Sequence, residues 1–273
     1  MEIRETAMSS QLRTIAARTV AIVDLGGYRA RSGRWVDLSA DVSAAVAGTR
    51  LYLPDEPLQP DTARNPAPRV EVTGETSLAA ARRIGGQPAL LVFASARNPG
   101  GGFRTGARAQ EEDIARASAL HACLAAAPAY YAHHRAEPDL RYSDRVIYSP
   151  AVPVFRDDTG ELLEQPYPVA MLTAAAPNLR AIHTNQPQLA ATVPGILRQR
   201  ALRVLRVAAA HGHRQLVLGA WGCGVFGNTT TEVANAFHIA LHHVDRFDHI
   251  VFAVFDHTPH APTRQAFAAR FGR

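Results

Sequence analysis

The sequence is organised around Asn98-Pro99-Gly100-Gly101-Gly102, which is followed after seven residues (Phe103 to Ala109) by Gln110-Glu111-Glu112. Upstream, residues 89–94 (Ala-Leu-Leu-Val-Phe-Ala) form a short apolar run with the length and composition of a buried strand. Downstream, residues 113–120 predict the first turns of a helix. The two motifs therefore lie between a strand end and a helix start, which is where α/β proteins bind ligands.

The three consecutive glycines, Gly100, Gly101 and Gly102, predict a binding loop. Without Cβ atoms the backbone can approach a ligand closely and present its N–H groups, at a cost in conformational entropy that structure alone rarely justifies. Glu111 and Glu112 fall near the start of the helix, where free N–H groups and the helix dipole favour carboxylates. Acidic residues are common there without any function, so the combination of glycines and carboxylates carries the prediction.

A second glycine-rich stretch runs from Gly219 to Asn228 (Gly-Ala-Trp-Gly-Cys-Gly-Val-Phe-Gly-Asn). It follows the apolar residues 216–218 and precedes a helix that Asn228 or Thr229 can cap. Successive backbone N–H groups in such a turn form a concave anion site, and the helix dipole adds to it. We predict a diphosphate site, although a lone Gly-x-Gly pattern is also common at ordinary turns. The candidate residues are Gly222, Gly224, Val225, Phe226, Gly227 and Asn228, with Phe226 either stacking on a ribose or folding back into the core.

At this point the residues carry a resemblance. The Gly-Gly-Gly, seven-residue spacer and Gln-Glu-Glu pattern resembles the signature of the poly(ADP-ribose) glycohydrolases, in the wording of their bacterial-type branch, which is built on a macrodomain. The stretch from Gly219 to Asn228 is similar to the diphosphate-binding loop of that family. Residues 72–78 and 174–178 also resemble family stretches, so that the likeness extends from about Val70 to the C-terminus.

The resemblance implies a three-layer α/β/α macrodomain with a mixed sheet. It implies hydrolysis of the ribose–ribose O-glycosidic bonds of poly(ADP-ribose) to release ADP-ribose, working from chain ends, with no metal or other cofactor. The implied partners are ADP-ribose and poly(ADP-ribose) on modified proteins, with ADP-ribosylated nucleic acid as an open alternative and no membrane. The implied setting is the response to DNA damage.

Two adjacent residues of a helix point about 100° apart, since the repeat is ~3.6 residues per turn. Glu111 and Glu112 therefore do not straddle one bond as the opposed carboxylates of an ordinary glycosidase do. We assign Glu112 as the acid that protonates the leaving ribose hydroxyl and then as the base for water, and Glu111 as the group that holds the leaving ribose or the geometry of Glu112. Asn98 is the candidate partner of the distal ribose, or else forms an Asx turn before Pro99. Gln110 is expected to position Glu111 or the loop; the adenine candidates, chosen by position along the chain, are Glu75, Thr76 and Phe255.

The composition fits a soluble α/β protein with an acidic ligand. The chain has 273 residues, 47% of them apolar, which is enough for one large domain or a domain with an extension. All 29 basic residues are arginine, and the formal charge of +5 fits nucleic acid or a phosphate-rich polymer without choosing between them. No signal-peptide pattern and no apolar run near ~18 residues is evident, so we expect a cytoplasmic protein.

We take residues 1–68 as an N-terminal extension packed on the main domain and residues 69–273 as the macrodomain-like catalytic domain. Residues 1–18 have helical spacing, Val20 to Leu25 is a candidate strand, and residues 55–68, with four prolines, predict an irregular connection. Strands and helices then alternate, as in a three-layer domain with a mixed sheet. The predicted strands are 69–72, 89–94, 146–150, 167–172, 215–219 and 249–255, with a turn at 157–160; the predicted helices are 77–84 with Ser77 as candidate cap, the one containing Glu112, 194–211, 230–243 and 262–270.

Other reactive residue types support no separate site. The twelve histidines include His211/His213 and His242/His243, spacings that occur in metal sites, but no cysteine accompanies them and we expect no metal. Cys123 and Cys223 are predicted to be free thiols in a reducing compartment. Because Cys223 has no obvious activating partner, we interpret it as structural.

Three functions remain open at this stage. The first is the glycohydrolase just described, acting at chain ends or within chains. The second keeps the pocket and removes single ADP-ribose units from nucleic acid or protein. The third is a non-catalytic ADP-ribose reader, against which the intact Gln110-Glu111-Glu112 argues, because a reader needs no acid at that point.

Overall fold

The computed structural model describes residues 2–58 and 67–272, so most of the predicted connection at 55–68 lies outside the described residues. Its centre is a seven-stranded sheet in the order β3-β6-β7-β5-β8-β9-β4. The central strand β5 (Ala89–Phe93) pairs in parallel with β7 and β8, and β9 pairs in parallel with β8 and β4, whereas β6 and β3 are added antiparallel. The other bounds are β3 (Arg50–Tyr52), β4 (Arg69–Thr73), β6 (Val146–Arg156), β7 (Leu162–Ala174), β8 (Gln215–Leu218) and β9 (His249–Ala253).

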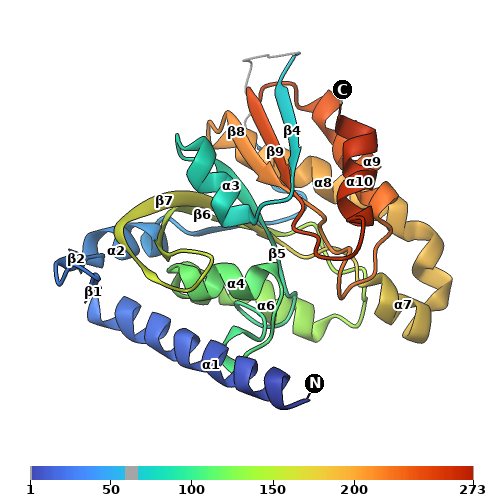
Figure 1. Ribbon diagram of the computed structural model, residues 1–273. Coiled ribbons are helices and arrows are strands. Elements are labelled where there is room, and N and C mark those ends of the chain that lie inside the picture. The colour runs from blue at the N-terminus through green and yellow to red at the C-terminus, as the bar shows by residue number, and fades with distance from the viewer. Residues whose placement is uncertain (1, 59–66, 273) are drawn as a thin grey trace.

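Helices cover both faces of this sheet (Figure 1). Because side chains alternate along a strand, Leu91 of β5 points into one apolar cluster and Leu90 and Val92 into the other. The first cluster is closed by α8 (Val193–Ala210), α9 (Thr230–His243) and α10 (Pro262–Phe271). The second is closed by α1 (Glu2–Leu25), α2 (Ser39–Ala47), α3 (Ser77–Ile84), α4 (Gln110–Ala117), α5 (Leu120–Ala125) and α6 (Pro128–Ala136). The predicted three-layer fold with a mixed sheet is confirmed.

Three short helices and a small hairpin complete the described elements. The helix α7 (Leu179–Asn185) and the 3-10 segments η1 (Phe103–Thr105) and η2 (Pro187–Thr192) lie in connections, and β1 (Gly27–Arg29) pairs with β2 (Trp35–Asp37) as a separate two-stranded sheet. No helix in the described ranges is both long enough and apolar enough to span a bilayer.

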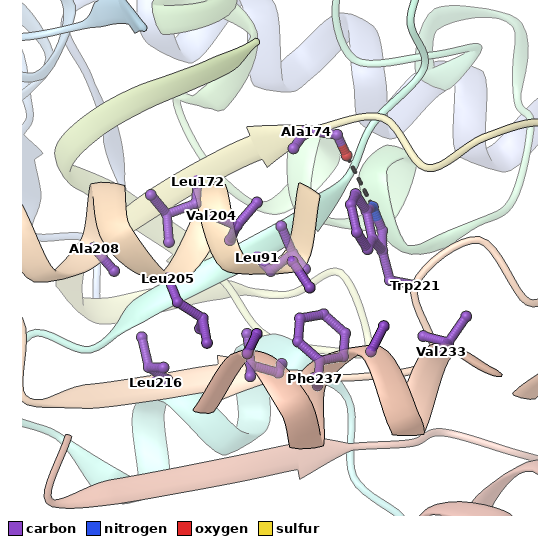
Figure 2. Packing of buried hydrophobic residues seen from close by; sticks show 14 of the residues in the cluster. Leu91, Leu172, Ala174, Val204, Leu205, Ala208, Leu216, Trp221, Val233 and Phe237 are labelled. Atoms are coloured by element: carbon purple, nitrogen blue, oxygen red, sulfur yellow. Dashed lines mark hydrogen bonds between the residues drawn. The ribbon is translucent and has the colours of Figure 1, made fainter. Parts of the chain in front are cut away.

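Trp221 fixes the loop after β8 to the core. Figure 2 shows its indole beside Leu91, Val204 and Phe237, and its Nε1–H donates to the carbonyl oxygen of Ala174 at 2.9 Å. The side chain is 1% exposed. Since burying a large apolar side chain stabilises by roughly 2–3 kcal/mol, this contact holds the start of the glycine-rich loop against the end of β7.

The candidate strand at Val20 to Leu25 is wrong, because α1 continues to Leu25. Ala16 and Val20, four residues apart, pack with Phe103 and Ala115. Between them, Thr19 donates from Oγ1 to the carbonyl oxygen of Arg116 at 2.6 Å. Tertiary packing of one helical face thus outweighs the strand preference of the β-branched residues.

Residues 50–52 form β3, an edge strand of the main sheet that pairs with β6. The segment before residue 68 therefore contributes a strand to the sheet as well as packing on it, and the division at residue 68 stays a prediction.

The strands β6 and β7 are longer than predicted, and the predicted turn at 157–160 joins them. The predicted strands stop early because prolines interrupt the apolar pattern; the register shift between Ser149 and Val152 accommodates them in the observed strand. The prediction that Ser77 caps α3 is also wrong: Thr76 is the N-cap, and its Oγ1 accepts from the N–H of Ala79 at 3.1 Å.

Candidate active site

A cavity of about 1290 Å³ opens at the carboxyl ends of β4, β5, β8 and β9. The chain leaving β5 continues toward β7, whereas the chain leaving β8 continues toward β9, so the two loops diverge and leave a crevice between them. Most predicted site residues line this cavity. They are Glu75, Thr76, Asn98, Gly101, Gly102, Gln110, Glu111, Glu112, Gly222, Gly224, Val225, Phe226 and Phe255, while Gly100, Gly227 and Asn228 belong to the same loops without lining it.

The glycine loop lies directly against both carboxylates. A Cβ atom on Gly101 would stand 2.3 Å from Oε1 of Glu112 and 3.2 Å from Oε2 of Glu111. The N–H of Gly102 donates to Oε1 of Glu112 at 2.9 Å. This bond fixes one carboxylate oxygen of Glu112, which lines the cavity, and Oε2 makes no hydrogen bond with the described residues.

Glu111 is buried, with 2% of its surface exposed. Its Oε2 accepts from the N–H of Ser95 at 2.6 Å, and its Oε1 has no hydrogen-bond partner among the described residues. Burial raises the pKa of Glu111 well above its ordinary value, and the nearby Glu112 adds to the rise, against the opposing backbone N–H groups of Ser95 and Gly100. Burial therefore favours the neutral form of Glu111, and its Oε1 is buried without a hydrogen-bond partner among the described residues.

The raised pKa of Glu111 predicts a pH-dependent stability difference. A group whose pKa is raised by folding adds to the free energy of unfolding at low pH. The whole contribution is present below the pKa of the unfolded chain, about 4.3 for Glu, and it is lost as the pH rises through the pKa of the folded protein. Glutamine cannot ionise, so we expect the unfolding midpoint of Glu111→Gln, relative to wild type, to be higher at pH 8 than at pH 5. Each pKa unit involved corresponds to about 1.4 kcal/mol, or on the order of 3 °C in a chain of this size.

Thermal unfolding at the two pH values measures this difference. Glu232→Gln, at a partly exposed position on the first turn of α9, is the matched control and should show the same midpoint difference from wild type at both pH values. An equal shift for Glu111→Gln at pH 5 and pH 8 would contradict the inferred neutral state.

Gln110 ties the helix that carries Glu111 and Glu112 to the central strand. Its Oε1 accepts from the N–H of Phe93 at 2.8 Å, and its Nε2 donates to the carbonyl oxygen of Leu91 at 2.8 Å and to Oγ of Ser77 at 3.1 Å. The pairing of β5 with β8 covers only Ala89 and Leu90, so the side-chain amide takes the place of a strand partner where the two strands diverge. Gln110 positions the start of α4 rather than contacting Glu111.

Gly101 has φ of +58°, so an alanine there meets both backbone strain and the Glu112 carboxylate. We expect Gly101→Ala to lower kcat by about 10- to 100-fold, because a displacement of about 1 Å at a reacting group has effects of this size. Gly212→Ala is the control: its φ is +79° and a Cβ there meets no atom within 4 Å. Both variants should lose about 1–2 kcal/mol to the left-handed conformation, and only Gly101→Ala should lose turnover. Equal turnover in initial-rate assays of the two would contradict the carboxylate contact.

Asn98 is exposed and lines the cavity. Its carbonyl oxygen accepts from the N–H of Gly101 at 3.0 Å, and its own N–H donates to Oγ of Ser95 at 3.1 Å. Its side-chain amide makes no hydrogen bond within the described residues. The turn before the glycines is thus held by backbone groups, and the Asn98 amide is available to a ligand.

The loop after β8 presents several unused donors. Within the described residues, the backbone N–H groups of Gly222, Gly224, Val225 and Phe226 reach no protein acceptor, whereas that of Gly227 donates to Gly224 at 3.1 Å. Val225 is 71% exposed at the tip of the loop. A run of free N–H groups before a helix start has the electrostatics of an anion site.

Asn228 and Phe226 shape this loop from behind. Asn228 is 3% exposed, and its Nδ2 donates to the carbonyl oxygens of Pro177 at 2.8 Å and Gly222 at 3.1 Å. Thr229, not Asn228, is the N-cap of α9, and it makes no side-chain capping bond. Phe226 is half-buried against the core, with its ring 6.0 Å from that of Tyr142, and still lines the cavity. Phe226 therefore packs partly on the core, and its stacking on a ribose stays a prediction.

The adenine candidates lie together because β4 and β9 are neighbours. Glu75 and Thr76 follow β4, and Phe255 follows β9 with 56% of its surface exposed. The carboxylate of Glu75 pairs with Arg83 at 2.6 Å, and Oγ1 of Thr76 bonds both oxygens of Asp158 at 2.9 Å. The ring of Phe255 lies 4.0 Å from that of His257 in an edge-to-face contact, and more than half of Phe255 is still exposed.

Sequence reasoning missed the opposite wall of the cavity. Met8, Leu12 and Ile15 of α1 line it, together with residues 157–160 at the tip of the β6–β7 hairpin. Figure 1 shows α1 running beside α4. The apolar stripe of residues 1–18 signals a packed helix, but no pattern in the chain indicates what that helix packs against.

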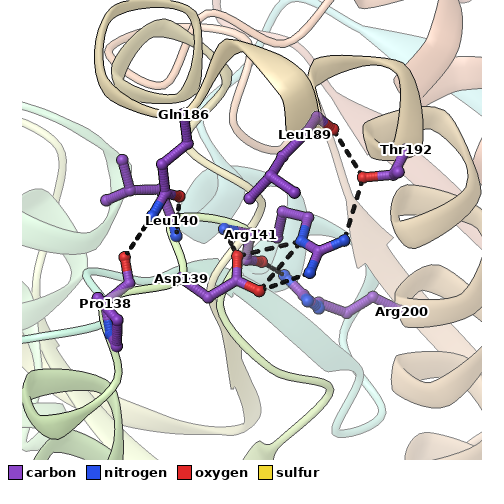
Figure 3. Close-up of polar contacts among 8 residues, drawn as sticks. All are labelled: Pro138, Asp139, Leu140, Arg141, Gln186, Leu189, Thr192 and Arg200. Atoms are coloured by element: carbon purple, nitrogen blue, oxygen red, sulfur yellow. Dashed lines mark hydrogen bonds and ion pairs between the residues drawn. The ribbon is translucent and has the colours of Figure 1, made fainter.

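A polar cluster behind the glycine-rich loop after β8 fixes the remaining wall. Figure 3 shows Arg141 between Asp139, at 2.7 Å, and Thr192, at 3.3 Å, with Gln186 bonded to the backbone of Leu140 and Pro138. The buried Arg200 donates to the carbonyl oxygens of Arg141 and Ala175, each at 2.8 Å. Residue 176, which lines the cavity, is held in place by this cluster.

The cysteines and histidines add no reactive centre to the site. Burial raises the pKa of Cys223 to about 12 and that of Cys123 to about 11, so both thiols stay protonated near neutral pH. In the part of the chain that the structure describes, no group of three or more His, Cys, Asp or Glu side chains is arranged to hold a metal ion.

Known proteins with a similar sequence and fold place the chain in a family. A family model described as "Microbial-type PARG, catalytic domain" matches residues 16–157, about half of the chain. The chain is similar to the crystal structure of poly(ADP-ribose) glycohydrolase from Thermomonospora curvata, with 50% sequence identity and a TM-score of 0.88 over 96% of this chain and 100% of that chain. The same figures hold for that enzyme bound to the inhibitor ADP-HPD.

A second organism supplies a further relative. The poly(ADP-ribose) glycohydrolase of Deinococcus radiodurans in complex with ADP-ribose is 43% identical, with a TM-score of 0.78 over 84% of this chain and 96% of that chain. No curated protein matches the chain. The resemblance found in the glycine and glutamate motifs is confirmed, and the chain belongs to the microbial-type poly(ADP-ribose) glycohydrolases, a family of glycoside hydrolases.

Proposed function

We propose that this chain hydrolyses the ribose–ribose O-glycosidic bonds of poly(ADP-ribose) and releases ADP-ribose from chain ends. The observation that carries the proposal is the placement of Glu111 and Glu112 against Gly101 and Gly102, on a cavity whose other loop presents free backbone N–H groups. This pairs an acid with an anion site in one crevice.

The terminal ADP-ribose unit would lie across the two loops. Its diphosphate would accept from the N–H groups of Gly222, Gly224, Val225 and Phe226, with Gly227 and Asn228 shaping the loop. Asn98 would hydrogen-bond the distal ribose, and Phe226 would pack on it. The adenine would reach the end of the cavity formed by Glu75, Thr76 and Phe255.

Glu112 would act first as the acid and then as the base. With Oε1 held by the N–H of Gly102, Oε2 donates its proton to the departing ribose hydroxyl as the bond to the anomeric carbon breaks. The resulting carboxylate then takes a proton from the water that attacks that carbon. The bound diphosphate stabilises the oxocarbenium-like state, and Glu111 holds the leaving ribose or the geometry of Glu112.

The physiological substrate would be poly(ADP-ribose) attached to protein, turned over in the cytoplasm as part of the response to DNA damage. Mass spectrometry of the products formed from a poly(ADP-ribosyl)ated protein tests the reaction. We expect free ADP-ribose to accumulate. Binding of ADP-ribose without any release from polymer, but with release from mono-ADP-ribosylated DNA or protein, would replace this function by the removal of single units. Binding with no release from any of them would indicate a reader.

The end-directed part of the proposal has its own test. A polymer whose terminal ribose is chemically capped should resist the enzyme, and continued release of fragments from it would show cleavage within chains.

A further inference from the structure

A second, smaller hollow of about 450 Å³ lies beside the catalytic cavity. Its walls come from α1, from the end of β1 and from the tip of the β6–β7 hairpin. Ile15, Arg156, Thr159 and Gly160 line both spaces. The hollow is thus separated from the catalytic cavity by no more than the side chains and backbone of these shared residues.

Four arginines give this hollow a strong positive charge. Its lining includes Arg18, Arg29, Arg31 and Arg156. Among the described residues that line it, the one carboxylate is Glu161. Arg18 and Arg31 are exposed and make no hydrogen bond or ion pair within the described part of the chain. Like charges gathered without matching carboxylates raise the local concentration of anions.

Arg156 is the one buried arginine among the described residues of this hollow, and hydrogen bonds hold its side chain in place. It is 6% exposed; its Nε donates to Oγ1 of Thr19 at 3.1 Å and its Nη1 to the carbonyl oxygen of Gly160 at 2.9 Å. Its Nη2 is buried and has no partner among the described residues. A guanidinium that is fixed on one side and has spare N–H groups on the other is suited to a phosphate oxygen.

We propose that this hollow binds the diphosphate of the ADP-ribose unit on the leaving side of the scissile bond. The inference rests on the proposed function, in which the terminal unit occupies the loop after β8 and the adenine end. Arg116 lies one turn after Glu112 on α4 and lines the catalytic cavity, and its carbonyl oxygen accepts from Oγ1 of Thr19, which in turn accepts from Nε of Arg156. The hollow therefore lies beside the helix that carries Glu112, within reach of a unit that departs from Glu112. Each polymer unit carries one diphosphate, and the hollow supplies its counter-charge.

The test compares two substrates that share the terminal ADP-ribose. One is poly(ADP-ribose) of defined length; the other is ADP-ribose linked to nitrophenol, whose leaving group has no phosphate. In the double variant Arg18→Gln/Arg31→Gln, we expect the KM for polymer to rise about 3- to 30-fold, as two surface charge contacts allow, with kcat unchanged. The constants for the nitrophenyl substrate should stay within about twofold of wild type, because its leaving group does not reach the hollow.

The control is Arg198→Gln/Arg206→Gln, which removes the same charge from exposed positions of α8, a helix that covers the other face of the sheet. Its KM for polymer should match that of wild type. Raising the salt concentration should increase the KM for polymer more steeply in wild type than in the Arg18/Arg31 variant. The variant has two fewer arginines to displace counterions from the polymer when it binds.

The outcomes separate this inference from the proposed function. If wild type cleaves neither substrate, the proposed function fails. If wild type cleaves polymer and the Arg18/Arg31 variant does so with an unchanged KM, the second diphosphate site is refuted and the proposed function stands. Equal losses on both substrates would show that the arginines act through the catalytic cavity. Loss of binding to a single-stranded oligonucleotide, with no change for polymer, would make the hollow a nucleic-acid surface and overturn the inference.

Discussion

Glu112→Gln is expected to lower kcat for release of ADP-ribose by about 10²- to 10⁴-fold, the usual contribution of a general acid. Glutamine keeps the shape of the side chain and can still accept from the N–H of Gly102, but it has no proton to give to a leaving hydroxyl. The loss should therefore fall on kcat, with little change in the affinity for ADP-ribose. Initial rates on polymer and calorimetric titration with ADP-ribose measure the two quantities.

The control for this substitution is Glu232→Gln, the same chemical change at a partly exposed position on the first turn of α9, where the side chain does not line the cavity. It should retain the wild-type kcat. If Glu112→Gln kept more than about a tenth of the wild-type turnover, the acid would have to be another group, and Glu111 would be the next to replace.

Arg200→Met is expected to lower the free energy of unfolding by about 3–5 kcal/mol, because removing one partner of a buried ion pair leaves the other uncompensated. Arg200 is 1% exposed, and its Nε pairs with Oδ1 of Asp144 at 2.8 Å. The variant also leaves the carbonyl oxygens of Arg141 and Ala175 without their donor. Methionine fills much of the same volume, so the loss reports mainly the polar contacts.

Denaturant titration of Arg200→Met and of Arg198→Met measures this effect. Arg198 is exposed on the same helix, two residues away, and its replacement should cost less than about 0.5 kcal/mol. A loss below about 1 kcal/mol for Arg200→Met would mean that the network in Figure 3 holds its shape without Arg200. The wall behind the loop after β8 would then depend on packing alone.

The part of the site that could be predicted from the sequence is the part whose residues lie close together in the chain. The three glycines and the two glutamates lie within 13 residues, between a strand and a helix that have clear periodic patterns. Gly101 is required because the carboxylates of Glu111 and Glu112, only ten and eleven residues further on, leave no room for a Cβ atom. Both sides of this contact therefore lie in one short stretch of sequence.

The rest depends on contacts between distant segments, which periodicity does not encode. The residues from Val20 to Leu25 include several with strand propensity, yet the packing of Ala16 and Val20 on Phe103 keeps them helical. The strand β3 has three residues, too few for an alternating pattern, and is defined by its pairing with β6. The hollow beside the cavity is lined by Arg18, Arg31 and Arg156, which come from three separate segments. No spacing in the sequence predicts that these arginines lie close together.

The contact of α1 with the glycine loop has a consequence for how the enzyme is assembled. Ser9 and Thr105 are bonded across 96 residues of chain, and Thr19 and Arg116 across 97. During synthesis the helix leaves the ribosome long before the loop that it must support, and closing so large a loop costs entropy before any contact compensates for it. A partly made chain that already has α1 therefore has no active site until the glycine loop and α4 have followed it.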